Sequence, residues 1–127
     1  MKTRTLVILS SAIEAATALA LIAVPDLVAH LLLGTELTGT GTAIARVAGF
    51  ALLALALACW PGSDDATPHA TRALFVYNLL AGLYLGYLRV GGGFTGSLLW
   101  PACVLHVVLA FLLARPAYQT GSSATAR

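Results

Sequence analysis

Charged residues are scarce in this sequence: seven are Lys or Arg and five are Asp or Glu, together 9% of the chain. A soluble globular domain carries about 25% charged residues, so this chain has too few to cover a surface exposed to water. The net charge is only +2 and the basic residues are scattered, whereas a nucleic-acid-binding domain gathers Lys and Arg in one patch. The scarcity of charge therefore excludes a soluble domain, and we expect no nucleic-acid partner.

Cysteine is equally scarce, and the short motifs of common enzymes and cofactor sites are absent. The two cysteines, Cys59 and Cys103, form neither a CxxC pair nor a metal-binding spacing. Two of the histidines, His30 and His106, are expected near opposite faces of a membrane, which argues against a haem held by two histidines. No nucleophile elbow, phosphate loop or zinc-protease motif is found. We therefore predict no cofactor and no metal, and we favour a protein that is not an enzyme.

What the chain has instead is long apolar runs. Hydrophobic residues make up 59% of it, and the mean hydropathy is +0.90. A membrane-spanning helix needs about 20 apolar residues, and four nearly uncharged runs approach that length. They cover residues 5–24, 42–60, 73–88 and 98–114. We predict an all-α integral membrane bundle of four transmembrane helices, forming one domain over 1–117, followed by a disordered polar tail, 118–127.

The first of these runs admits a second interpretation. Two basic residues precede an apolar stretch, 6–13, and the small residues 16–18 resemble the cleavage site of a secretory signal. Glu14, however, lies where such a signal is uncharged, and apolar sequence continues as far as Val24. We therefore expect a first helix that is retained.

The basic residues also indicate an orientation. In a four-span protein both chain ends and the middle loop share one side of the membrane. That side would hold Lys2, Arg4, Arg72, Arg115 and Arg127, and the other side would hold Arg46 and Arg89. Because Lys and Arg accumulate in cytoplasmic segments, we expect both termini in the cytoplasm. The abundance of Ala, Gly and Arg favours a bacterial inner membrane.

Glu14 is the most informative polar residue, because it lies near the middle of the first span. An ionisable side chain at this depth costs a few kcal/mol and by default marks a functional or paired site. Ser10, Thr17 and Ala18 share its helical face, so this small, polar face is expected to point into the bundle. A purely structural Glu14, protonated or hydrogen-bonded, is the alternative.

Two residues of other spans are expected at the depth of Glu14. Counted from the cytoplasmic ends, Glu14 lies about nine residues deep, Asn78 about six and His106 about eight, which is roughly 9–14 Å at the helical rise. We predict a Glu–His–Asn layer that satisfies polar groups which lipid cannot. Arg46 enters from the opposite side as a competing partner of Glu14. The plainer alternatives are Asn78 as a hydrogen-bonding link between helices and His106 as a structural residue.

The third span also carries a packing motif. Gly82 and Gly86 form a GxxxG sequence on the face that holds Asn78. Such glycines let another helix approach closely, either from the same chain or from a second copy. Tyr77 and Tyr84 of this span add hydroxyl groups either to the bundle interior or to the membrane interface.

The run 46–60, together with Trp100, Pro101 and His106, resembles a group of small four-span bacterial membrane proteins of no assigned activity. The size, the four spans and the lone acidic residue of the first span are also similar to small multidrug-resistance transporters. That resemblance implies that Glu14 exchanges a proton for a cation. Only Glu14 matches residue by residue, and the aromatic and glycine motifs of that family's second and third spans are missing here.

We therefore expect an oligomeric transport or channel-like component of the lipid bilayer, whose membrane-embedded glutamate responds to protons or cations. The candidate binding residues are Glu14, His106, Asn78, Arg46 and Tyr84. One alternative is an accessory subunit that docks a larger membrane complex through Gly82 and Gly86. Another is a small membrane enzyme acting on lipid or terpenoid substrates, with Glu14 and His106 as acid and base.

Overall fold

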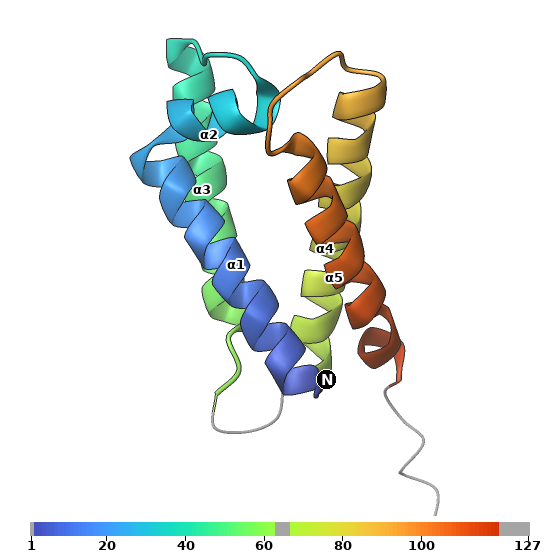
Figure 1. Cartoon of the computed structure of the whole chain (residues 1–127). Helices are drawn as coiled ribbons and strands as arrows, with labels where there is room; N and C mark the ends of the chain where they lie inside the picture. Colours follow the sequence, from blue (N-terminus) through green and yellow to red (C-terminus); the bar gives the residue numbers. More distant parts are fainter. Residues whose placement is uncertain (1, 63–66, 120–127) are drawn as a thin grey trace, which may run out of the picture.

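The computed structural model describes residues 2–62 and 67–119, and over these residues it contains helices and no strand. The helices are α1 (Thr3–Ala23), α2 (Pro25–Leu33), α3 (Gly39–Cys59), α4 (Pro68–Val90) and α5 (Leu99–Tyr118) (Figure 1). All of them except α2 are long and apolar enough to cross a membrane. The predicted all-α bundle with four membrane-spanning helices is therefore confirmed.

The observed spans follow the predicted runs, and the largest shift is at the start of α4. This helix begins at Pro68 and not at residue 73, because the Thr67 side chain accepts a hydrogen bond from the backbone nitrogen of Ala70 (3.3 Å). A capping threonine followed by proline is a favourable helix start. At the other end of the chain, the predicted tail begins at residue 118, whereas in the structure Tyr118 is the last residue of α5. The predicted tail beyond Gln119 lies outside the described residues.

The four spans form two closely packed pairs, α1 with α3 and α4 with α5 (Figure 1). In each pair a glycine lets the two helices touch. A Cβ on Gly49 of α3 would lie 2.9 Å from the carbonyl oxygen of Ala18, and one on Gly82 of α4 would lie 3.2 Å from the backbone nitrogen of Val107. Of the two alternatives for the GxxxG face, the structure shows packing within the chain.

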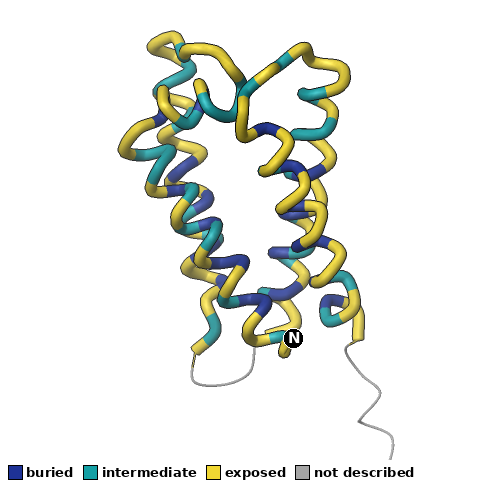
Figure 2. The backbone as a smooth tube through the Cα atoms, in the orientation of Figure 1, coloured by how far each residue is buried: buried dark blue, intermediate teal, exposed yellow. Residues whose placement is uncertain are grey.

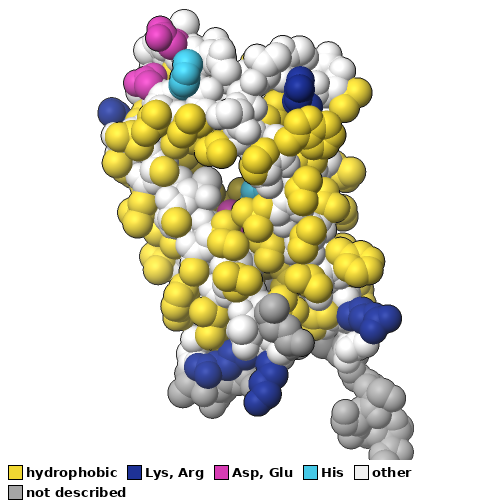
Figure 3. Space-filling view, viewed as in Figure 1, with side chains coloured by type: hydrophobic (Ala, Val, Ile, Leu, Met, Phe, Trp, Pro, Cys, Tyr) yellow, Lys and Arg dark blue, Asp and Glu magenta, His cyan; other side chains and the backbone are white. Residues whose placement is uncertain are grey.

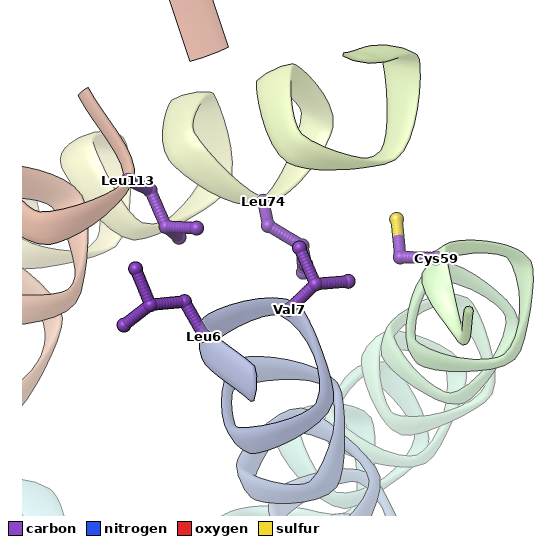
Figure 4. Packing of buried hydrophobic residues seen from close by; sticks show 5 residues of the cluster. All are labelled: Leu6, Val7, Cys59, Leu74 and Leu113. Atoms are coloured by element: carbon purple, nitrogen blue, oxygen red, sulfur yellow. The ribbon is translucent and has the colours of Figure 1, made fainter. Parts of the chain in front are cut away.

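The two pairs are joined at both ends of the bundle. At the end that holds the N-terminus, buried apolar residues from all four spans pack together: Leu6, Val7, Cys59, Leu74 and Leu113 (Figure 4). At the other end α2 lies across the bundle (Figure 1), and the carbonyl oxygen of Leu31 accepts a hydrogen bond from the backbone nitrogen of Leu98 (2.8 Å). Between these two joints the pairs meet through a polar layer.

Apolar side chains cover the outside of the bundle as well as its interior. Leu83 is 62% exposed and Phe111 is 79% exposed, although both lie within spans. Figure 2 shows exposed positions along the outward sides of the helices. Figure 3 shows apolar side chains over the middle of the molecule and charged side chains at its two ends. This distribution fits a middle that contacts hydrocarbon between two ends that contact water, and the protein is membrane-embedded.

Candidate functional site

The inner face of α1 is polar around Glu14. Glu14 has no solvent-accessible surface, and Ser10 and Ala18 on the same face are likewise fully buried. Thr17 is partly buried and donates a hydrogen bond to the carbonyl oxygen of Ile13 (3.0 Å) in the same helix. The face that helical periodicity assigns to Glu14 therefore points into the bundle.

Asn78 links α1, α4 and α5 through hydrogen bonds. Its Nδ2 donates to Oγ of Ser10 (3.1 Å) and to the carbonyl oxygen of Leu74 (2.9 Å). Its Oδ1 lies 2.8 Å from Nδ1 of His106. Because an amide oxygen can only accept, this contact requires a proton on Nδ1 of His106. In the neutral ring, Nε2 is then the nitrogen that can accept a proton.

His106 also faces Glu14. Its Nδ1 lies 3.9 Å from Oε1 of Glu14, which is longer than a hydrogen bond but close enough for an ion pair when the ring is protonated. The structure thus brings Glu14, Asn78 and His106 into one layer, as the depth count predicted.

The Glu14 carboxyl group is short of hydrogen bonds. Among the described residues neither of its oxygens has a hydrogen-bond partner of good geometry. The same is true of Oγ of the buried Ser11. Besides His106, the polar group that interacts with this carboxyl is the hydroxyl of Tyr77. A buried polar group without a hydrogen bond costs about 1–3 kcal/mol. The centre of the bundle therefore keeps an acceptor that a proton or a ligand can use.

Tyr77 belongs to this site, although it is not among the predicted binding residues. Its ring meets the ring of His106 edge-on, with the centroids 5.8 Å apart and an interplanar angle of 80°. Its hydroxyl interacts with Glu14. The signal that points to it is the spacing Leu74–Tyr77–Asn78 on α4, which is the three-and-four spacing of a helix face turned inward.

A pocket of about 310 Å³ opens between α1, α3 and α4. Its lining is aliphatic apart from one tyrosine: Leu21, Ala48, Ala51, Leu52, Leu55 and Tyr77. Tyr77 therefore borders the pocket and also reaches Glu14.

Two of the predicted binding residues lie elsewhere. Arg46 is exposed on α3, and no contact joins it to Glu14 among the described residues. Because Gly49 lies against Ala18, Arg46 is about seven residues, or roughly 10 Å, from Glu14 along the bundle. Tyr84 is 61% exposed and stacks on Tyr87. The structure does not bring Arg46 or Tyr84 to Glu14, and their roles in binding stay predictions.

The two glycines of α4 are covered by α5. A Cβ on Gly86 would lie 3.5 Å from Sγ of Cys103, and this thiol donates a hydrogen bond to the carbonyl oxygen of Gly82 (3.4 Å). At Gly82 this face is occupied by α5, and docking of a larger complex through Gly82 and Gly86 stays a prediction. Both cysteines are free, and no group of three or more metal-binding side chains occurs within residues 2–62 and 67–119.

No protein-family model, curated protein or solved structure matches this chain. The fold and the site therefore define its class by themselves. The protein is a membrane-embedded four-helix bundle whose two helix pairs enclose a polar layer with a buried, incompletely hydrogen-bonded carboxyl group.

Proposed function

We propose that this protein is a transport or channel-like component of a membrane, in which Glu14 binds a proton and a cation in alternation. The supporting observation is that the Glu14 carboxyl is fully buried between the two helix pairs and lacks hydrogen bonds of good geometry. Ionisable groups inside membrane spans mark ion and proton pathways. A glutamate with a purely structural role would be expected to have its oxygens satisfied, as most buried polar groups do.

The exchange follows from the chemistry of one carboxyl group in an apolar surrounding. With a proton bound, Glu14 is neutral, and hydrocarbon tolerates it. After the proton leaves, the negative charge needs a cation nearby, since an unpaired buried charge is very costly. His106 can supply that charge only while its ring is protonated, with Nδ1 3.9 Å from Oε1 of Glu14. A proton and a cation therefore compete for the same oxygens, and binding of one releases the other.

We also propose a bacterial inner membrane with both termini in the cytoplasm. Lys2, Arg4, Arg72 and Arg115 lie toward the end that holds the N-terminus. The opposite end holds two acidic residues near α2 alongside its two arginines. This imbalance is the one that orients membrane proteins with their more basic side inward. We further propose that the protein forms an oligomer. Four helices are a small number to enclose a pathway for ions, and further copies of the chain can pack against the apolar outer surface.

The test is exchange by protein reconstituted in liposomes that contain a pH-sensitive dye. A gradient of sodium or of a small organic ammonium ion is expected to change the internal pH when the wild-type protein is present. Glu14→Gln should lose this response, because the amide can neither release a proton nor pair with a cation. Glu36→Gln is the matched control, since Glu36 is exposed outside the spans, and it should respond as the wild type does. Undiminished exchange by Glu14→Gln would refute the proposal.

The pocket favours a second candidate function, a small enzyme acting on lipid or terpenoid substrates. Tyr77 connects the aliphatic pocket with Glu14, and His106 lies 3.9 Å from the same carboxyl. Such a pair can act as general acid and base. Conversion of a prenyl substrate by the wild type, lost in both Glu14→Gln and His106→Gln, would select this function over transport.

A further inference from the structure

We propose that the pocket between α1, α3 and α4 binds a neutral, single-chain lipid alcohol, which enters from the bilayer and places its hydroxyl group at Tyr77. This inference goes beyond the proposed transport, because it concerns a separate ligand and stands whether or not Glu14 exchanges cations.

The walls of the pocket define the body of the ligand. Five of the six lining residues are Leu or Ala, so they offer an occupant contact with apolar groups only. Ala48 and Ala51 are exposed on α3, and the pocket is therefore open to the surface that faces lipid. An apolar chain can enter the pocket sideways from the bilayer without crossing water. On entry the chain moves from one apolar surrounding to another.

The volume limits the length of the chain. About 310 Å³ is at the lower end of the range for small-molecule pockets. If each non-hydrogen atom takes roughly the 30 Å³ of a water molecule, the pocket holds about ten such atoms. This suits a chain of eight to ten carbons, or two isoprene units, and it is too small for the two acyl chains of a phospholipid.

The polar groups at the inner end define the head group. Tyr77 is the one residue of the lining with a polar side-chain group, and its hydroxyl can both donate and accept. An alcohol matches it, because the hydroxyl of the ligand can donate to the Tyr77 oxygen or accept its proton.

Charged head groups fit less well. A fatty acid carboxylate would be repelled by Glu14 when this residue is ionised, and the described residues around the pocket offer it no basic partner. An ammonium head would have to pass the aliphatic walls as a charge, which costs several kcal/mol in hydrocarbon. A neutral hydroxyl pays a much smaller desolvation penalty.

The experiment is photolabelling of the full chain in liposomes with a decanol analogue that carries a diazirine in its chain. Labelled peptides are mapped by mass spectrometry, and unlabelled decanol, geraniol, decylamine and decanoic acid are added as competitors. We expect the label to concentrate on the pocket residues of α1, α3 and α4. Decanol and geraniol should reduce it strongly, and the amine and the acid should reduce it weakly. Competition by geraniol alone, or by decanol alone, would show whether the alcohol is an isoprenoid or a fatty alcohol.

Matched variants separate the pocket from the rest of the lipid-facing surface. Ala51→Phe fills the pocket from an exposed position and should abolish the concentrated label, whereas Ala54→Phe, exposed on α3 but outside the pocket, should leave it unchanged. Tyr77→Phe should weaken competition by decanol about fivefold, which is the change in affinity expected from the loss of one hydrogen bond. Tyr84→Phe is its control, since Tyr84 is exposed and stacked on Tyr87.

Two results would overturn the alcohol site. One is labelling spread evenly over the lipid-facing surface and unaffected by Ala51→Phe. The other is stronger competition by decylamine than by decanol, lost in Glu14→Gln, which would replace the alcohol by a cation and leave the proposed exchange intact. Conversely, alcohol binding in a protein without cation exchange would remove the transport function alone.

Discussion

At the scale of single residues, Asn78 holds the polar layer together, because its amide group bonds to Ser10, to the carbonyl oxygen of Leu74 and to His106. Asn78→Leu keeps a side chain of similar size and removes all three hydrogen bonds. We expect a loss of about 1–2 kcal/mol in the free energy of unfolding, the upper range for hydrogen bonds between membrane helices. Unfolding by a denaturing detergent, followed by circular dichroism, measures this loss.

Ser10→Ala is the control for this variant. It removes only the contact between Ser10 and Asn78 and leaves the contact with His106 in place, so its cost should be clearly smaller. If Ser10→Ala proved the more destabilising of the two, Asn78 would not be the residue that connects the helices.

The layer itself could be predicted from the sequence, because Glu14, Asn78 and His106 are polar residues deep within apolar runs and the helical rise converts their positions into depths. Tyr77 could not be placed in the same way. A tyrosine is equally at home at a membrane interface and in a bundle interior, and only the rotation of α4 decides between them. The distance of Arg46 from Glu14 could not be predicted either, because the axial register of α1 and α3 follows from the contact between Gly49 and Ala18.

At the scale of helices, the close approach within each pair depends on glycines, and Gly49 and Gly86 differ in what surrounds them. A Cβ on Gly49 would lie 2.9 Å from a backbone carbonyl of α1, whereas one on Gly86 would lie in ordinary contact, 3.5 Å from Sγ of Cys103. We expect Gly49→Ala to lower stability by about 1–3 kcal/mol through overpacking. Gly86→Ala should be neutral or slightly stabilising, because alanine favours a helix more than glycine does.

Both variants can be compared by thermal unfolding in the same detergent. The contrast separates steric packing from helix propensity, since both replace glycine by alanine inside a span. Equal effects of the two substitutions would mean that the distance between α1 and α3 does not depend on Gly49.

The spans were predictable as elements, but their pairing was not. Apolar runs of about 20 residues identify membrane helices by length alone. In a soluble bundle an apolar stripe would also show which face of each helix is inward, but here outward residues such as Leu83 and Phe111 are as apolar as the interior. The pairing of α1 with α3 follows from small residues at the contact, and one glycine among the twelve of the chain carries too little signal to find it.

At the scale of the whole molecule, the unequal distribution of basic residues predicts its orientation. Lys2, Arg4, Arg72 and Arg115 lie toward one end of the bundle, and Arg46 and Arg89 lie toward the other with Asp26 and Glu36. Fluorescent reporters that fold only in the cytoplasm should therefore be active when fused to either terminus. A reporter that is active only outside the cytoplasm should be active when it is inserted in the loop between α4 and α5.

The same physical reason predicts how the orientation can be changed. Replacing Lys2 and Arg4 by Gln and adding lysines at Thr35 and Thr40, near the acidic end, reverses the excess of basic residues across the first span. Because basic residues near the ends of the spans govern insertion, a substantial fraction of this variant should insert with its termini outside, and both sets of reporters should show mixed activity.

Replacing Asp26 and Glu36 by Gln instead should leave the orientation unchanged, since acidic residues contribute little to this rule. Reporters that place both termini of the unaltered chain outside the cytoplasm would refute the proposed orientation and leave the fold and the polar layer as they are.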